Sequence, residues 1–527
     1  MNNLATIPQL VDAGGRPLRM QDTAHGGASL ISEELQSWQP PYQSADADIL
    51  PEWETLVSRT RDMIRNHGLT SGAVQTHLDN IVGPKLRLVA KPDWRALNQD
   101  LAWAREWTRN VEAKFRQWAD DIDRYCDAGR RLSLTGMITQ GYRSFMNTGE
   151  ILAVAEWLPK RPTRYATAMQ MVDPDLLSNV NNQADTDLLR RGVQLDLYGA
   201  AVAYWIASGW RNDPFFSRGP VTWRRVARET AWGRTQVIHI FDQERPGQTR
   251  GKGGLVPVLA KMKMLERFEQ ATLQAAILNA MYAATIESGM DWNSVGSAIG
   301  AGTEDAVLNY MASRADWHAG AHVRYNGVKI PHLYPGEKLT LNQPQHPKAE
   351  FAQFEEATLR HLAGGLNMSY EQFSRDYSKS TYSSARAAML ESWRFFKNRR
   401  HHVAGRFARL VYTLWLEEAI DNGDVEIPPG APSFYEAKTA WTRCNWIGPG
   451  RGHIDPLKEA NATKVEYSMH LTTLEKEAAE RGEDWEELLD QRAEERQRMT
   501  ELGLDPADLM GPTPVAQPAE IGDPNAA

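Results

Sequence analysis

Apolar residues along this chain recur mainly at the three- and four-residue spacing of helices. The longest such stretch runs from about Ser383 to Ile420 and contains one glycine, Gly405. A similar pattern covers residues 51–129. Both regions are predicted to be helical. In the longer stretch, one helix face about 100° wide collects Met389, Trp393, Phe396, Val403, Phe407, Leu410 and Leu414.

Two more helices are predicted on either side of a short segment rich in turns. The first covers residues 256–288, because Pro257 suits a first helical turn and no other proline or glycine interrupts the stretch. The second covers residues 347–365 and ends in a pair of glycines. Between them, residues 289–345 combine glycine-rich turns with a strand-like stretch at 321–325. We therefore expect two helices that bracket a small mixed segment.

Strand patterns concentrate between residues 150 and 245. Short β-rich pieces separated by turn residues lie at 150–157, 193–197, 201–206 and 236–241. Helical patterns return after residue 455 and continue to about 504. The fold class predicted from these patterns is α+β and helix-rich. A length of 527 residues corresponds to three or four domains at about 150 residues each.

The two ends of the chain differ from its interior. Residues 1–45 are polar and close with two prolines, which is typical of a flexible arm, and residues 513–527 contain too few apolar side chains to order themselves. No apolar run reaches the roughly 18 residues of a membrane span, and the start lacks the pattern of a secretory signal. With only Cys126 and Cys444, a disulfide framework is not expected, and a reducing cytosol is the expected setting.

Charge is distributed unevenly along the sequence. The formal net charge is −8, and residues 471–510 hold 13 acidic against 5 basic residues. Residues 392–416 contain no acid but carry Arg394, Lys397, Arg399, Arg400, Arg406 and Arg409. Two interpretations stay open: two solvated helix faces, or a local contact with a polyanion at the basic stretch and repulsion at the acidic one.

Motifs for catalysis are absent from the sequence. The loop 247–253 has one residue too few between its glycines, and a glycine after its lysine, for a phosphate-binding Walker loop. No nucleophile elbow, paired zinc histidines or Cys-x-x-Cys set is present, and His401 and His402 point about 100° apart on a helix. We expect no enzyme activity, no catalytic or metal-binding residues, and no cofactor.

Several ordered motifs resemble those of the lambda family of phage portal proteins. The signature lies in residues 366–394, where Tyr370-Glu371, Asp376-Tyr-Ser378 and Tyr382-Ser-Ser-Ala-Arg386 follow one another. Other pieces that agree in order are Val172-Asp-Pro-Asp-Leu176, Tyr204, Arg245-Pro-Gly-Gln-Thr-Arg-Gly251, Leu333-Tyr-Pro-Gly-Glu337, Gly448-Pro449 and Ile454-Asp-Pro-Leu-Lys-Glu459. The similarity covers roughly residues 30–510.

The resemblance implies a portal fold assembled into a dodecameric ring at one vertex of the capsid. Its expected partners are the terminase large subunit, the major capsid protein, head-completion and tail connector proteins, and double-stranded DNA that passes without sequence specificity. The expected location is the virion, with assembly in the host cytoplasm, for a phage or a prophage. The implied parts are an N-terminal arm (1–45), wing (46–255), first stem helix (256–288), clip (289–345), second stem helix (346–366), tunnel loop (367–385), long wing helix and strand segment (386–455), crown (456–512) and tail (513–527).

Within this scheme, basic residues near the tunnel loop are the candidates for contact with DNA. They are Arg375, Lys379 and Arg386, although Arg386 could equally pair with Glu391 or a neighbouring subunit, and a segment rich in Ser and Tyr is also typical of an ordinary loop. Candidates on the long helix are Arg394, Lys397 and Arg400. The alternative function is a head-completion or tail scaffold protein without enzyme activity. It would also lack catalytic motifs but is not expected to carry two long helices around a clip-sized segment.

Overall fold

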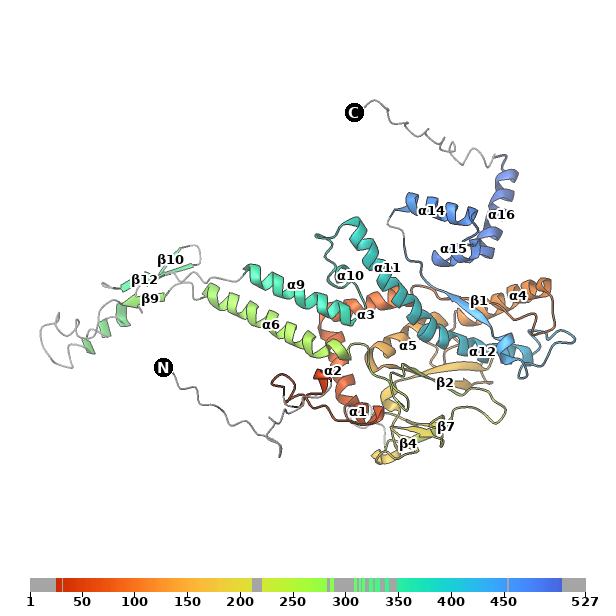
Figure 1. The fold of residues 1–527 in the computed structure, drawn as a ribbon, viewed down its shortest axis with the longest axis horizontal. Coiled ribbons are helices and arrows are strands. Elements are labelled where there is room, and N and C mark those ends of the chain that lie inside the picture. The colour runs from red at the N-terminus through yellow and green to blue at the C-terminus, as the bar shows by residue number, and fades with distance from the viewer. Residues whose placement is uncertain are drawn as a thin grey trace, which may run out of the picture.

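The computed structural model describes most of the chain between residues 25 and 504 (Figure 1). The described residues are 25–30, 32–210, 220–281, 285–288, 308–309, 312–313, 315–317, 322–325, 328–331, 337–340, 348–452 and 455–504. Most of the predicted arm, much of the predicted clip and the predicted tail 513–527 lie outside them.

Helices make up much of the described chain, as the sequence patterns predict. They are α1 (Ala45–Ile49), α2 (Trp53–Asn66), α3 (Gly68–Ile81), α4 (Leu101–Ala119), α5 (Leu134–Thr148), α6 (Val256–Met281), α9 (Lys348–Gly365), α10 (Tyr370–Ser374), α11 (Tyr382–Arg399), α12 (Gly405–Asp421), α13 (Lys438–Trp441), α14 (Pro456–Ser468), α15 (Leu474–Glu480) and α16 (Trp485–Glu501). The fold class predicted from the sequence, α+β and helix-rich, is confirmed.

Strands are short and pair antiparallel. They are β1 (Arg87–Ala90), β2 (Glu150–Trp157), β3 (Thr167–Val172), β4 (Leu189–Arg190), β5 (Val193–Leu195), β6 (Ala201–Ala207), β7 (Trp223–Ala227), β8 (Val237–Phe241), β9 (Thr285–Ser288), β10 (His322–Tyr325), β11 (Val328–Pro331), β12 (Glu337–Thr340) and β13 (Cys444–Ile447). All four β-rich pieces predicted between residues 150 and 245 form strands, namely β2, β5, β6 and β8.

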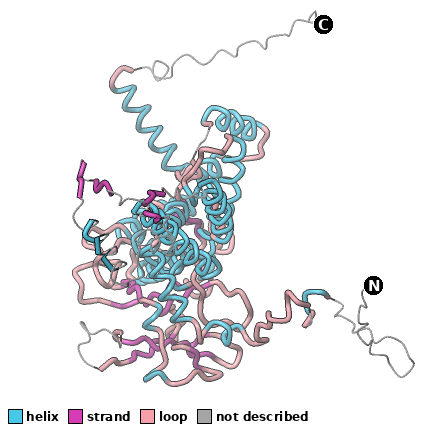
Figure 2. The backbone as a smooth tube through the Cα atoms, turned by 90° about the vertical axis from the view of Figure 1, so that its left-hand side faces the viewer, coloured by secondary structure: helices cyan, strands magenta, loops and turns pink. Residues whose placement is uncertain are grey.

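Among the described residues, the body has two larger sheets, a two-stranded sheet formed by β1 and β13, and two cores. A three-stranded sheet in the order β3-β2-β8 packs against helices on one face. A smaller core around Leu177 and Tyr204 lies between its other face and a four-stranded sheet in the order β4-β5-β6-β7. The strands of the two larger sheets lie on one side of the body and most helices on the other (Figure 2). The main core is rich in aromatic side chains, including the fully buried Trp415, Trp441, Tyr142, Tyr412, Phe396 and Phe407.

The helix predicted from about Ser383 to Ile420 is confirmed as one nearly continuous rod. It consists of α11, a π-helical turn at Arg400–Ala404, and α12. The sequence predicts one apolar face, but residues 411–419 of α12 are buried on all sides. This burial includes Glu418, whose carboxylate accepts backbone N–H groups of Ala166 (2.6 Å) and Thr167 (2.9 Å). Both oxygens of the Glu418 carboxylate are therefore hydrogen-bonded by the body.

Helices α6 and α9 lie side by side and extend away from the body (Figure 1). The rings of Phe268 and Phe354 join the two helices at a centroid distance of 4.9 Å. At their base, Gly365 packs so closely on Val258 that an added Cβ would lie 2.3 Å from a Val258 methyl group. A side chain at position 365 would push the helices apart.

The prediction that the first of these helices continues to residue 288 is wrong. Helix α6 ends at Met281, and Thr285–Ser288 form β9, which pairs antiparallel with β12. The β-branched Thr285 and Ile286 favour a strand once a partner is present. Helical spacing in the sequence cannot reveal this partner, which lies about fifty residues further along the chain.

Candidate functional site

The segment between α9 and α11, predicted as a tunnel loop, is a short helix followed by a turn. Helix α10 begins with a capping box, in which Ser369 accepts the N–H of Gln372 and the Gln372 side chain accepts the N–H of Ser369. Buried Met368 and Phe373 fix it to the main core. A second capping box, formed by Thr381 and Ser384, starts α11. The segment is thus fixed at both ends.

Arg375 lies where α10 ends. Its backbone has a positive φ of 59°, which a non-glycine residue adopts rarely and which turns the chain away from the helix axis. Its side chain is exposed and makes no ion pair among the contacts of the described residues. Arg375 therefore presents an uncompensated positive charge.

Lys379 lies in the same turn but has an acidic partner on α9. Its Nζ lies 2.8 Å from Glu356, which also accepts a hydrogen bond of 2.6 Å from Arg360. The hydrogen bond from Lys379 lowers the pKa of Glu356, and the same bond raises the pKa of Lys379. The side chain of Lys379 is nevertheless 70% exposed, so its ammonium group remains accessible beside its partner.

Among the described contacts, Arg386 forms its ion pair with Glu459 and not with Glu391. Its Nη2 lies 3.9 Å from Oε1 of Glu459 on α14, and the other oxygen of Glu459 lies 3.7 Å from Arg451. Glu459 is buried, with 7% of its side chain exposed. Arg386 therefore helps to join the long helix to α14.

The candidates on the long helix separate into three environments. Arg394 is exposed and has no ion pair among the described contacts, and Lys397 pairs with Glu480 on α15. Arg400 instead donates to three backbone carbonyls, those of Ile81 (3.0 Å), Asn80 (2.7 Å) and Pro449 (2.8 Å). Burial lowers the pKa of Arg400 to about 10. Its guanidinium is a structural clamp and is not presented to a polyanion.

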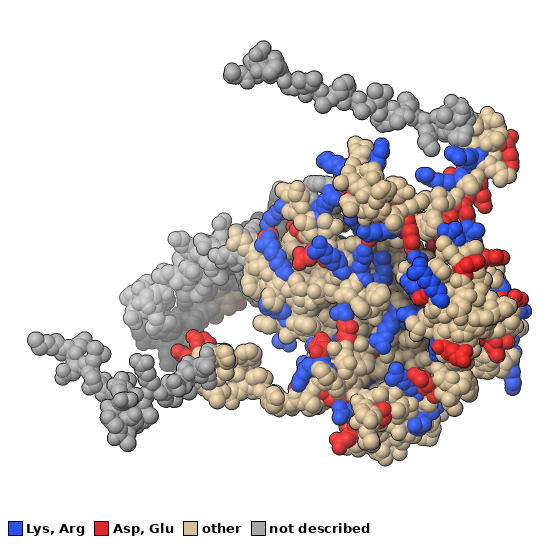
Figure 3. All heavy atoms as spheres, turned by 45° about the vertical axis from the view of Figure 1, so that its right-hand side comes forward, with Lys and Arg blue, Asp and Glu red and all other residues tan. Residues whose placement is uncertain are grey.

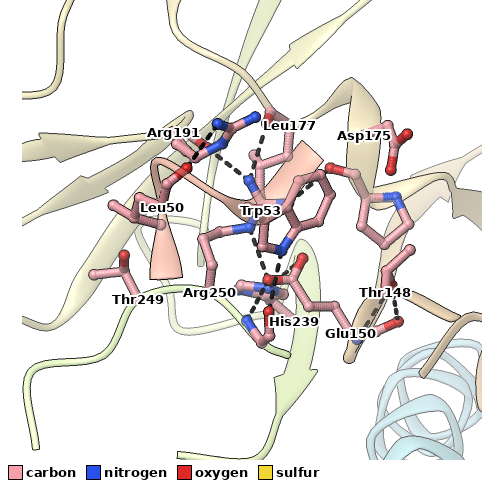
Figure 4. A network of polar contacts seen from close by, with 12 residues as sticks. Leu50, Trp53, Thr148, Glu150, Asp175, Leu177, Arg191, His239, Thr249 and Arg250 are labelled. Carbon is pink, nitrogen blue, oxygen red and sulfur yellow. Dashed lines mark hydrogen bonds and ion pairs between the residues drawn. The ribbon is translucent and has the colours of Figure 1, made fainter. Parts of the chain in front are cut away.

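The loop 247–253 before α6 does not match a Walker phosphate loop. In the structure it carries Arg250, whose buried contacts attach the loop to the body and which we call the anchor (Figure 4). Arg250 is fully buried and pairs with the equally buried Glu150 at 2.7 Å. Its other donors reach the carbonyls of Leu177 (3.1 Å), Arg191 (3.1 Å) and Pro174 (2.9 Å). Each of the three guanidinium nitrogens thus donates to a protein oxygen.

Electrostatics within the anchor favour the ionised pair. Burial by itself would raise the pKa of Glu150, but the charge and hydrogen bond of Arg250 and the contact with His239 together outweigh burial and hold that pKa at about 2. The adjacent Thr249 donates to Asp46 from its N–H (2.8 Å) and its hydroxyl (2.9 Å). The anchor therefore joins α1, β2 and the start of α6, a role that the charge of Arg250 in the sequence does not reveal.

The described residues contain no grouping of three or more His, Cys, Asp or Glu side chains suited to a metal ion. Both cysteines are free, and burial raises the pKa of Cys126 to about 12 and that of Cys444 to about 11. Thiols with such values are poor nucleophiles at neutral pH. Within the part of the chain that the structure describes, no helix is long and apolar enough to cross a membrane.

Comparison with known proteins gives consistent matches over nearly the whole length. The profile of the family described as "Phage portal protein, lambda family" matches residues 32–400. The chain is 39% identical over 507 residues to Portal protein B of Escherichia phage lambda, covering 95% of this chain and 94% of that protein. It is also 39% identical over 510 residues to the portal protein of Escherichia phage N15, covering 95% of each.

Similarity to solved structures is weaker. A chain in the virion of a native gene transfer agent particle is matched over 83% of this chain and 94% of its own length, with 12% identity and a TM-score of 0.43.

Proposed function

Because the chain belongs to the lambda family of phage portal proteins, we propose that identical copies close into a dodecameric ring at one vertex of a capsid. In this proposal the terminase large subunit packages double-stranded DNA through the ring, and head-completion and tail connector proteins attach to it. The major capsid protein surrounds it, and the genome leaves by the same passage. The ring resides in the virion after assembly in the host cytoplasm.

The observation that carries this proposal is the similarity at 39% identity across 95% of the chain. It spans the body, the paired helices α6 and α9, the segment between α9 and α11, and the C-terminal helices. A protein that is only a head-completion or tail scaffold has no reason to share all these parts with portal proteins. The proposed role is structural, with no chemistry of the chain's own.

The charge of the chain suits a passage better than a clamp. Each phosphate that a protein neutralises strengthens binding and slows sliding, and a ring multiplies every residue by the number of subunits. A net charge of −8 per chain, with Arg375 and Lys379 as the exposed cations of the turn proposed to face DNA, limits such contacts. Phosphate contacts also carry no sequence information, so DNA of any sequence can pass.

We assign the parts of a portal to the described elements as follows. The body and the long helix form the wing, α6 and α9 the stem, and α14, α15 and α16 the crown. The clip is the segment between the two stem helices. The turn from Arg375 to Lys379, which lies between α9 and α11 and projects two cations, is the proposed DNA-facing part of the tunnel loop.

A double substitution tests the proposed DNA contact. In Arg375→Ala with Lys379→Ala, the core residues that hold α10 are unchanged, so rings should assemble normally, while packaging or retention of DNA should fall. The matched control is Lys160→Ala with Lys464→Ala, which removes two exposed cations from other elements. The measurement is the amount of nuclease-protected DNA per head. Equal amounts in both variants would contradict the assignment.

A further inference from the structure

The C-terminal helices α15 and α16 contact the body through ion pairs in which the helices supply the acids and the body supplies the cations. In every ion pair that the structure describes between residues 471–504 and the body, the acid belongs to the C-terminal helices and the cation to the body. The pairs are Arg87–Glu487, Arg116–Glu487, Arg109–Glu486 (3.7 Å), Lys91–Glu475 and Lys397–Glu480. Glu487 bridges two arginines, so the contacts form a network.

Apolar packing contributes little to this junction. Ala478 is the one buried apolar side chain among the described residues 456–504, and no residue of this range belongs to either hydrophobic core. Two cavities, of about 480 and 780 Å³, separate the helices from the body. Trp485 lines both. The junction thus depends chiefly on charge, which salt screens.

The body side of the junction is rich in basic side chains, and we call this surface the basic face. Figure 3 shows Lys and Arg side chains gathered beneath the C-terminal helices. Five cations of the face are those paired with the C-terminal helices: Arg87, Lys91, Arg109, Arg116 and Lys397. The other three, Arg105, Arg406 and Arg409, are exposed, line the two cavities and make no ion pair among the described contacts.

Acids of the body scarcely offset this charge. Asp242 pairs with Arg399 and Asp93 with Arg443. Burial raises the pKa of Glu112 to about 7, so this carboxyl is partly neutral at physiological pH. The carboxylates that balance the basic face are therefore mainly those of α15 and α16.

We propose that the basic face binds the phosphate backbone of double-stranded DNA. In this proposal the helices α15 and α16 act as a mask, because their carboxylates pair with the cations that would otherwise bind phosphate. Carboxylate and phosphate oxygens compete for the same guanidinium and ammonium donors. The cations lie on β1, α4, α11 and α12, except Lys91, which directly follows β1, so we expect them to keep their positions when the mask is lifted. This surface is additional to the proposed passage and does not require ring closure.

A full-length variant with an uncharged mask tests the proposal. It carries Glu475→Gln, Glu480→Gln, Glu486→Gln and Glu487→Gln, which remove the acidic partners of the basic face. The matched control carries Glu466→Gln, Glu483→Gln, Glu494→Gln and Glu495→Gln, which change the net charge equally at exposed sites that make no ion pair with the body among the described contacts. Binding of a 30-base-pair duplex of random sequence is measured by fluorescence anisotropy.

We expect the mask variant to bind the duplex about tenfold more tightly than the control in about 50 mM salt. The gain should vanish at high salt, because about five newly freed cations imply a steeper salt dependence. Adding Arg116→Gln and Lys397→Gln to the mask variant should remove the gain. Equal affinities of the mask and control variants, or a gain that survives loss of these two cations, would overturn the proposal.

A milder variant covers the case in which four substitutions unfold the C-terminal helices. Glu475→Gln with Glu480→Gln frees only Lys91 and Lys397 and should raise affinity about threefold. Sedimentation velocity without DNA provides the remaining check. Stronger self-association of the mask variant without tighter DNA binding would assign the basic face to a second copy of the chain and overturn the proposal.

Discussion

The guanidinium of Arg250 lies 4.3 Å from the ring centroid of Trp53, and both side chains are buried where α2, β2 and the start of α6 meet. The indole N–H of Trp53 donates to the carbonyl of Gly251 at 3.0 Å. A planar cation on an aromatic face, with its edges bonded to Glu150 and to backbone carbonyls, is a contact that arginine makes and lysine cannot. This contact fixes the base of α6 to the body.

Replacing Arg250 by lysine should therefore destabilise the protein. An ammonium group cannot reach the carboxylate and three carbonyls together, and buried oxygen atoms would lose their donors. The expected loss is about 3–5 kcal/mol of unfolding free energy, measured by denaturant titration. Arg245→Lys is the control, because Arg245 is about half exposed and pairs with Asp48 at the surface. A loss equal in both variants would contradict the anchor.

The close contact between Gly365 and Val258 predicts opposite effects of two neighbouring substitutions. Gly365→Ala places a methyl group 2.3 Å from Val258, whereas nothing lies within 4 Å of a Cβ at Gly364. The first should cost about 1–3 kcal/mol of stability by overpacking, and Gly364→Ala should be neutral or stabilise by up to about 1 kcal/mol. Thermal unfolding measures both. Recovery of Gly365→Ala by Val258→Ala would confirm that the clash is the cause.

Glu112 should make stability fall as the pH rises through the weakly acidic range. Burial raises its pKa to about 7 from an ordinary 4.5, against a hydrogen bond from the N–H of Ala90. The folded state then binds a proton that the unfolded state has lost, so stability decreases between about pH 4.5 and 7. Glu112→Gln should match the parent near pH 4 and exceed it by about 1–3 kcal/mol at pH 8. A constant difference between the two proteins across this range would exclude the predicted ionisation.

The ionic junction predicts that the C-terminal helices detach in salt while the body stays folded. Raising the salt from about 0.05 to 0.5 M shortens the screening length to a few ångström. Backbone amides of α15 and α16 should then exchange with deuterium roughly tenfold faster, since salt weakens their anchoring contacts. Amides of α12, which is packed in the core, should not change. Uniform acceleration, or none, would contradict an electrostatic junction.

Local sequence patterns predict the helices and strands that form from the properties of neighbouring residues. The β-rich run of β2, the glycine pair at the end of α9 and the apolar spacing of α11 and α12 are all visible in short windows, and each element forms as expected. Strand β1 escapes notice because its four residues pair with β13 about 350 positions later. Strand β9 is missed for the same reason.

The candidate site is harder to predict because charge in a sequence does not say what lies opposite. Arg394 and Arg400 fall on one flank of the same helix, but only Arg400 meets backbone carbonyls of α3 and of the segment before α14. The sequence around Arg250 likewise does not reveal that a carboxylate and three backbone carbonyls surround its guanidinium. Conversely, the acidic excess of residues 471–510 is plain in the sequence, and the structure supplies its partner, the basic face.

Electron microscopy of the purified full-length chain in negative stain tests ring formation most directly. If the surfaces of neighbouring copies are related by a rotation that closes, the particles are annuli with a central hole. We predict such closed rings. Monomers, or open filaments formed by a rotation that does not close, would contradict the proposal that this portal protein encircles DNA.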